Sequence, residues 1–275
     1  MQKTKGKIIT FANQKGGVGK TTSAINLSAA VARLGKRVLI VDSDPQGNAS
    51  SGLGINVKEM GYHLYHCFLE EAKVAQAIRP TRDLENLKIL PTHIDLVGLE
   101  VELIHVAKRE RYLSEMLGPL REVYDFIFID CPPSLGLLTI NALTASDSVI
   151  IPLQCEYYAL EGLSQLIRTI RLVKNSYNTK LSLEGILLTM FDRRNRLTYK
   201  VAKDVKRHFK DSVFDTVIPR NVRLSESPSH GKPIMVYDPR SAGSLAYMAL
   251  GKEFLRRQAQ YSNRVNTASP PAASL

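Results

Sequence analysis

Residues 15–22 read KGGVGKTT and lie between an apolar, strand-like run that ends at Asn13 and a helical pattern that begins near Thr21. Glycines permit backbone angles closed to other residues, so successive N–H groups can converge on phosphate oxygens at the positive end of the helix dipole. Lys20 can neutralise the β- and γ-phosphates, and the Thr21 hydroxyl can coordinate Mg²⁺. The stretch departs from the general phosphate-loop pattern at Gln14, where that pattern has glycine. The predicted nucleotide-binding residues of this loop are Lys15, Gly16, Gly17, Val18, Gly19, Lys20, Thr21 and Thr22.

Two further strand-like runs end in carboxylates. Residues 126–130 read FIFID, the form expected of a buried strand that delivers Asp130 towards Mg²⁺ through a water molecule. Residues 41–48 read VDSDPQGN, where Asp42 and Asp44 are two apart and so point to the same side of a sheet. Either of these two carboxylates can orient an attacking water, or each aspartate can simply cap a turn. Ligands of open α/β sheets bind at the carboxyl ends of the strands, where these aspartates lie.

Strand-like and helix-like runs alternate along the chain. This alternation predicts an α/β fold with a mostly parallel twisted sheet and helices on both faces, and together with the phosphate loop it predicts a single-domain P-loop NTPase. The domain is expected to span residues 1–261, and the polar, proline-rich residues 262–275 are expected to form a disordered tail. The predicted strands are 7–13, 37–44, 124–130, 148–153, 185–191 and 213–219. The predicted helices are 21–34, 97–117, 160–174, 197–210 and 243–258.

The bulk composition is that of a folded protein. Of 275 residues, 44% are hydrophobic and 23% are charged, which excludes wholesale disorder and a fibrous architecture. Three widely spaced cysteines and the lack of a charged-then-apolar leader argue against a secreted disulfide scaffold and predict the cytoplasm. No apolar run approaches the roughly 20 residues that a membrane-spanning helix needs.

The net charge of +11 is the one unusual bulk property. Residues 193–240 hold 12 Lys and Arg against 5 Asp and Glu, so most of the excess lies in this stretch. Such a concentration of positive charge favours a polyanionic partner. The alternative is a solvated basic surface that has no partner.

Four segments together resemble the ParA/Soj partition ATPases of the deviant Walker A group. They are KGGVGKTT with its additional Lys15, VDSDPQGN, IDCPPS at residues 129–134, and IPRNVRLSESPSHGKP at residues 218–233. MinD-type division regulators and nitrogenase iron protein share the first motif, whereas the last is far more specific to ParA/Soj. The resemblance covers about residues 7–255. No DNA-binding domain precedes the loop, as in the short, chromosomal type.

The resemblance implies an ATP-dependent sandwich dimer, in which Lys15 reaches the phosphates of the nucleotide bound by the partner subunit. A cation supplied in this way stabilises transition-state charge as an arginine finger does. The implied catalytic residues are thus Lys15, Lys20 and Asp44, the last as the water-positioning carboxylate, while Asp130 is the Walker B residue. By the same resemblance, Pro219 and Asn221 border the adenine.

The resemblance also implies that a joint basic surface of the ATP-bound dimer binds DNA. Arg223 matches the family motif, and Arg194 is the less specific candidate because Arg193 stands beside it. Contacts from Lys and Arg to phosphates carry no base information, so sequence-independent duplex binding is expected. The alternative for Arg223 is an ion pair with Glu226. A ParB-type centromere-binding partner is expected to stimulate hydrolysis on the nucleoid.

Several rival interpretations are weaker. A MinD-like membrane regulator needs an amphipathic C-terminal helix, whereas this sequence ends polar and proline-rich. An iron–sulfur reductase needs a suitable cysteine pair, and a passive nucleotide-locked scaffold has no use for a water-positioning carboxylate. The remaining candidates are a metal site at His63, His66 and Cys67, which lacks a second ligand cluster in the sequence, and Cys131, Tyr157 and Tyr158, which are expected to serve packing or, for the tyrosines, dimer contacts.

Overall fold

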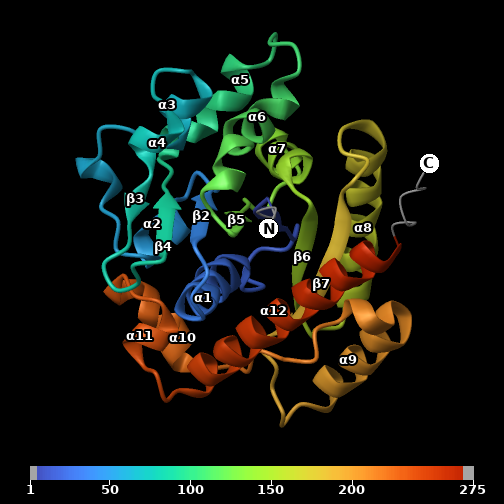
Figure 1. Ribbon diagram of the computed structural model, residues 1–275. Helices are drawn as coiled ribbons and strands as arrows, with labels where there is room; N and C mark the ends of the chain where they lie inside the picture. The colour runs from blue at the N-terminus through green and yellow to red at the C-terminus, as the bar shows by residue number, and fades with distance from the viewer. Residues whose placement is uncertain (1–4, 269–275) are drawn as a thin grey trace, which may run out of the picture.

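A computed structural model describes residues 5–268 and contains a seven-stranded sheet in the order β3-β4-β2-β5-β1-β6-β7 (Figure 1). The strands are β1 (Lys7–Phe11), β2 (Val38–Asp42), β3 (Arg79–Pro80), β4 (Leu87–Leu90), β5 (Phe126–Asp130), β6 (Ser148–Gln154) and β7 (Ser182–Thr189). All neighbouring strands are parallel except β3, which pairs antiparallel with β4. Strand β1 lies between β5 and β6 in the interior of the sheet, so the loop that follows β1 emerges near the middle of the sheet's carboxyl edge.

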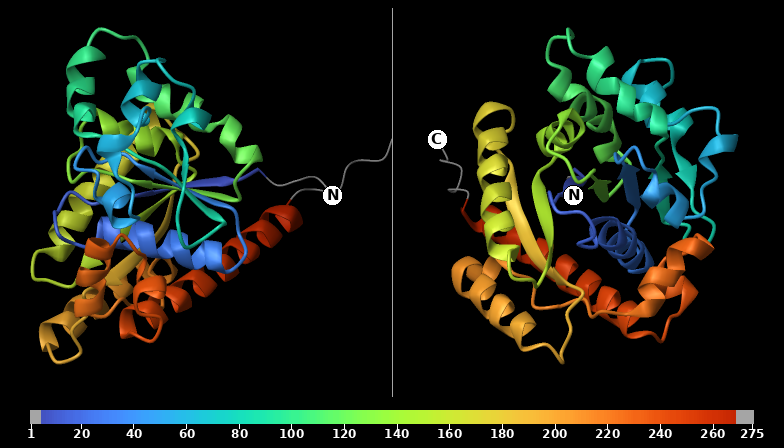
Figure 2. Two further views of the ribbon diagram at one scale, coloured as in Figure 1. Left: turned by 90° about the vertical axis from the view of Figure 1, so that its left-hand side faces the viewer. Right: turned by 180° about the vertical axis from the view of Figure 1, so that it is seen from behind.

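Helices cover both faces of this sheet (Figure 2). They are α1 (Lys20–Arg33), α2 (Asn48–Gly52), α3 (Leu64–Phe68), α4 (Val74–Ala77), α5 (Leu99–Glu102), α6 (Tyr112–Leu117), α7 (Leu137–Ala145), α8 (Ala159–Ser176), α9 (Arg196–Phe209), α10 (Val222–Glu226), α11 (Ile234–Tyr237) and α12 (Ala242–Ala268). Ile9 of β1 faces a core shared with α1 and α12, whereas Ile8 faces a core shared with α3, α6 and α7. This two-sided burial explains the continuous apolar strands and confirms the predicted fold class.

The predicted strand over 213–219 is wrong. This segment forms no continuous ladder with β7: Val213 bridges to Ile186, Ile218 N donates to the Leu188 carbonyl at 2.8 Å, and Pro219 bridges to Phe191 beyond the end of β7. Between them, the backbone N–H groups of Asp215 and Thr216 each donate to the Glu253 carboxylate of α12 at 2.8 Å. These groups are therefore not free to pair with a neighbouring strand.

Two other predicted boundaries differ from the structure. The helix predicted over 97–117 is broken between α5 and α6, because Lys108 has a φ of 60° that a continuous right-handed helix does not contain. The last helix continues past residue 258 to Ala268, since the sequence has no glycine or proline between Gly251 and Pro270. Residues 262–268 are thus helical where a disordered tail is predicted, and 269–275 lie outside the described residues.

Several short or fully buried elements have no recognisable pattern in the sequence. Strand β4 has four residues and β3 only two, below the length at which alternation identifies a strand. Helix α7 is buried nearly all round and therefore has no polar stripe to mark its period. Over residues 5–268, no helix combines the length and the apolar character that crossing a bilayer requires.

Candidate nucleotide-binding site

The glycine-rich loop joins β1 to α1 at the centre of the sheet. Gly17 has a φ of 72° and Gly19 a φ of 82°, both in the left-handed region that favours glycine. A hydrogen bond of 2.8 Å from the Thr189 hydroxyl to the Val18 carbonyl fastens the loop to the end of β7. Helix α1 begins at Lys20, directly after the loop, so its free N–H groups face the space that the loop encloses.

Asp130 ends β5 at the same edge and is fully buried. Neither of its carboxylate oxygens has a hydrogen-bond partner among the described residues. Burial, followed by the negative charge of Asp42, raises the pKa of Asp130 well above its ordinary value, whereas the Thr21 hydroxyl and the Lys20 ammonium lower it. A buried carboxylate of this kind, beside a hydroxyl, fits a hydrated Mg²⁺, which prefers oxygen ligands and retains several waters.

Asp42 and Asp44 have different surroundings. Asp42 lies opposite Asp130 in the β2–β5 register, and one of its carboxylate oxygens accepts bonds from the Ser50 backbone (2.8 Å) and hydroxyl (2.7 Å). Burial raises the pKa of Asp42 to about 6 despite these bonds. Asp44 is also buried and accepts a bond of 3.0 Å from the Gln46 backbone. The Asp42 carboxylate is therefore engaged in hydrogen bonds to Ser50 of α2. Asp44 is the better placed of the two aspartates to contact a ligand.

The two lysines of the loop point to different environments. Lys20 is buried at the start of α1, close enough to Asp130 to lower the pKa of that carboxyl. Lys15 is exposed, and its Nζ pairs with Glu156 Oε2 beyond the end of β6. The sequence analysis did not single out Glu156, because nothing in the local pattern shows that β6 brings it beside the loop.

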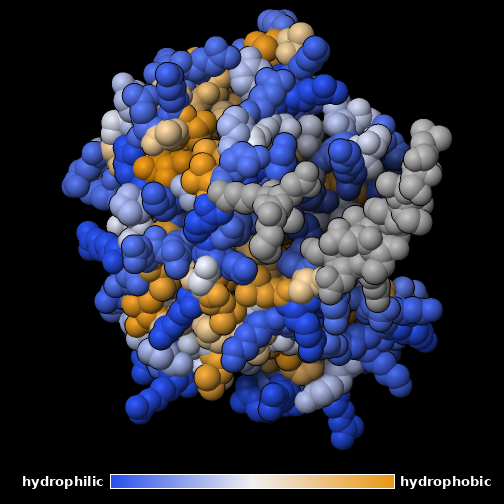
Figure 3. Space-filling view, in the orientation of Figure 1, coloured by the Kyte–Doolittle hydropathy of each residue, from blue (hydrophilic) through white to orange (hydrophobic). Residues whose placement is uncertain are grey.

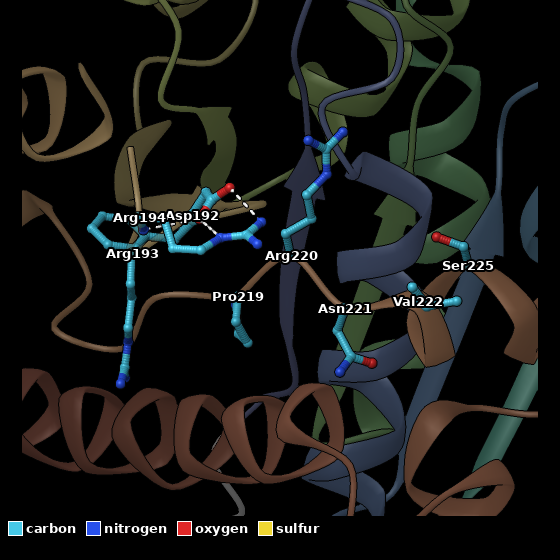
Figure 4. A pocket seen from close by; sticks show the side chains of 9 residues that line it. Asp192, Arg193, Arg194, Pro219, Arg220, Asn221, Val222 and Ser225 are labelled. Atoms are coloured by element: carbon cyan, nitrogen blue, oxygen red, sulfur yellow. Dashed lines mark hydrogen bonds and ion pairs between the residues drawn. The ribbon is translucent and has the colours of Figure 1, made fainter. Parts of the chain in front are cut away.

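A second part of the candidate site is a pocket of about 510 Å³ that includes Pro219 and Asn221 (Figure 4). The side chains of Pro219 and Asn221 lie on one side of their segment, while Arg220 points to the other. The Asn221 amide oxygen is buried and has no hydrogen-bond partner within residues 5–268. An unpaired buried acceptor is a natural contact for a donor group of a ligand.

Both candidate DNA-binding arginines have acidic neighbours. Arg194 donates from Nε to Asp192 Oδ1 at 3.1 Å, yet its side chain remains 88% exposed. Arg223 forms an ion pair with Glu226 at 2.8 Å, as in the alternative given for this residue from the sequence. Its Nε also lies 3.5 Å from Asp238 Oδ2. Both guanidinium groups remain accessible at the surface.

Three residues that the sequence assigns to packing or dimer contacts differ in their burial. Cys131 is buried, and this burial raises the pKa of its thiol well above the ordinary value, as expected of a packing residue. Tyr157 and Tyr158 are 75% and 72% exposed, so they do not pack within this chain. The dimer-contact interpretation of these tyrosines stays a prediction.

Comparison with known proteins identifies the family. Residues 6–183 match the family model described as an AAA domain. The chain is 58% identical over 248 residues to the sporulation initiation inhibitor protein Soj of Bacillus subtilis, covering 90% of this chain and 98% of that protein. It is 54% identical over 265 residues to the chromosome partitioning protein ParA of Myxococcus xanthus, covering 96% and 93%.

Solved structures share the fold. The cobyrinic acid a,c-diamide synthase from Mycobacterium smegmatis with bound ADP and magnesium has a TM-score of 0.81 at 36% identity, covering 92% of this chain and 96% of that one. The septum site-determining protein MinD from Pyrococcus horikoshii, complexed with Mg-ADP, has a TM-score of 0.75 at 30% identity, covering 90% and 95%. The relatives with the higher sequence identity are Soj and ParA proteins. The chain therefore belongs to the ParA/Soj chromosome-partitioning family of P-loop NTPases.

Proposed function

We propose that this protein is a Mg²⁺-dependent ATP hydrolase that partitions a chromosome or plasmid by switching between a DNA-free monomer and a DNA-bound sandwich dimer. The observation that carries this proposal is the meeting of the glycine loop, Lys20 and the unpartnered Asp130 carboxylate at one edge of the sheet. The Soj and ParA names of the relatives support the partition role.

In this proposal the loop N–H groups and Lys20 bind the phosphates. Thr21 and, through water, Asp130 hold Mg²⁺, which supplies charge neutralisation at the β- and γ-phosphates. Asp44 orients the attacking water, and Asn221 and Pro219 border the adenine. Lys15 leaves Glu156 to contact the nucleotide of the partner subunit.

A basic surface is proposed to bind duplex DNA when two copies meet. Helix α9 and the turn before it carry exposed cations, and Figure 3 shows a largely hydrophilic surface there, at the lower right. The cations are Arg193, Arg194, Arg196, Lys200, Lys203, Lys206 and Arg207. Arg223 on α10 adds to this charge. Binding to phosphates through such side chains places the protein on the nucleoid without sequence preference.

A ParB-type centromere-binding partner is proposed to accelerate hydrolysis and so release the dimer from DNA. Turnover of the isolated protein is then slow, and ATP serves as the switch between the two states. The MinD-like alternative, a membrane-associated division regulator, shares the fold and the loop but requires a lipid surface in place of DNA.

The decisive experiment measures duplex-DNA binding by wild type and Asp44→Ala with ATP, ADP or no nucleotide, at two salt concentrations. We expect ATP-dependent binding that weakens with salt, and an Asp44→Ala protein that stays on DNA after wild type has dissociated. Binding to liposomes of anionic lipid under the same conditions, with none to DNA, would support the MinD-like alternative. Equal release of Asp44→Ala and wild type would remove the role given to Asp44.

A further inference from the structure

A cluster of metal-ligand side chains lies away from the nucleotide site, between the turn before α3 and the segment that follows β4. His63, His93 and Asp95 each offer one ligand atom, and these atoms lie within 4.8 Å of one another. In the sequence, His63 appears without a second ligand group, because His93 and Asp95 are 30 residues further on. The structure brings the two groups together: Leu64 N donates to the Pro91 carbonyl at 2.9 Å, directly beside the histidines.

An unpartnered buried nitrogen is the second observation that points to a ligand. The His63 side chain is only 5% exposed, and its Nδ1 has no hydrogen-bond partner among the described residues. A buried polar atom without a partner is costly, and a metal ion is one of the few ligands that an imidazole nitrogen can bind.

Two further imidazoles lie beside His63. Its ring centroid is 4.2 Å from that of His66 and 5.1 Å from that of His93. A divalent ion binds imidazoles through their neutral ring nitrogens, so this cluster offers nitrogen ligands at short range.

We propose that His63, His93 and Asp95 bind a divalent transition-metal ion, with Zn²⁺ as the best fit. Imidazole and carboxylate ligands suit Zn²⁺, whereas Mg²⁺ prefers a site made entirely of oxygen. The two sites of this protein therefore select different metals. With zinc–nitrogen bonds of about 2.0–2.1 Å, neighbouring ligand atoms lie roughly 3.4 Å apart. His93 Nδ1 lies 2.8 Å from Asp95 Oδ2, and metal binding would exchange this contact for bonds to the ion through rotation of these partly exposed side chains.

His66 is a positioning residue in this arrangement. Its Nδ1 accepts a bond of 3.4 Å from the His63 backbone N–H, which holds the turn that presents His63. The bound metal would join this turn to the segment after β4, where the Thr92 backbone donates to the Ser50 hydroxyl at 3.3 Å. Because Ser50 also binds Asp42, the metal would stabilise the loops on this side of the sheet.

The test uses the full chain, treated with chelator and then freed of it, without nucleotide. Co²⁺ is titrated as a visible-absorption probe of the site, and Zn²⁺ is then added to displace it; the melting temperature is recorded with each metal and with Mg²⁺. We expect one Co²⁺ per chain, displacement by Zn²⁺, and a melting temperature raised by Zn²⁺ but not by Mg²⁺ at this site.

The variants His93→Ala and Asp95→Asn are expected to lose at least roughly tenfold in Co²⁺ and Zn²⁺ affinity. The control His105→Ala removes an exposed histidine outside the cluster and should bind as wild type does. Asp95→Asn changes an exposed, nearly isosteric side chain, so its result stands even where His93→Ala folds poorly. Wild-type affinity in both variants, or equal losses in the control, overturns the proposal. None of these readouts depends on ATP or DNA.

Discussion

Lys15 Nζ forms an ion pair with Glu156 Oε2 across the carboxyl edge of the sheet, within a single chain. Their side chains are 56% and 46% exposed, so water screens the pair and its contribution is small, about 0–1 kcal/mol. Lys15 can therefore exchange this partner for a phosphate group at little cost. The pair competes with the dimer contact proposed for Lys15.

Glu156→Gln removes the competing carboxylate and is expected to strengthen ATP-dependent dimerisation by up to about fivefold for each subunit, because at most about 1 kcal/mol is released per ion pair. Lys15→Ala is expected to abolish dimerisation while leaving part of the ATP affinity. Sedimentation with ATP and Mg²⁺ measures both effects. Glu161→Gln, an exposed change of the same kind on α8, is the control. A weaker dimer in Glu156→Gln would mean that Glu156 itself supports the interface.

Asp130→Asn is expected to stabilise the nucleotide-free protein at pH 7.5, by about 1–3 kcal/mol, because it removes a buried, unpartnered charge. The pKa of Asp130 is raised in the folded state, so the wild type loses stability as the pH rises from about 4 through that raised pKa. The advantage of the variant should therefore vanish below about pH 4. The same variant should bind Mg²⁺-ATP more weakly. Thermal unfolding and nucleotide titration over this pH range test both effects.

Asp125→Asn is the matched control, and it should destabilise the protein where Asp130→Asn stabilises it. The hydrogen bonds and charge of Arg37 lower the pKa of Asp125, so its stabilising effect is present above about pH 4 and is lost as the pH falls through its folded value. The variant should be slightly less stable than wild type at pH 7.5. A destabilised Asp130→Asn protein would contradict the burial argument.

Arg223→Glu is expected to weaken duplex-DNA binding in ATP and to lower the salt slope by roughly one unit per protomer, with dimerisation unchanged. The ion pairs of Arg223 with Glu226 and Asp238 lie at the surface and can exchange for phosphate contacts. Lys36→Glu makes the same charge change at an exposed position just after the end of α1, and this variant should bind DNA nearly normally. Filter binding at several salt concentrations measures the slope, and an unchanged slope in Arg223→Glu would exclude this contact.

Gly185→Ala is expected to destabilise the fold by about 1–3 kcal/mol. A Cβ at this position in β7 would approach the buried Phe214 ring to within 2.5 Å. Gly162→Ala is the matched control, since its Cβ meets nothing within 4 Å and lies in α8, where alanine is favoured by about 0.5–1 kcal/mol. Denaturant unfolding should show a lower free energy of unfolding than wild type for Gly185→Ala and a higher one for Gly162→Ala. Equal stability would show that Phe214 moves aside freely.

Much of the fold follows from local pattern. The glycine loop, the strands that end at Asp42 and Asp130, and the long helices α1, α8 and α9 are predictable, because burial on both faces and helical periodicity are written in consecutive residues. The edge strands β3 and β4 and the buried helix α7 are not, since they are too short or too uniformly apolar to show a period.

By itself the sequence determined the position of the phosphate-binding loop, since glycine freedom and residue order are local properties. Only the tertiary structure decided that Lys15 meets Glu156, that Ser50 binds Asp42, and that His93 joins His63. The first and last of these pairs link residues 141 and 30 positions apart, and the Ser50–Asp42 pair spans the turn between β2 and α2. Their approach depends on strand order and on the packing of loops at the sheet edge, which no local pattern encodes.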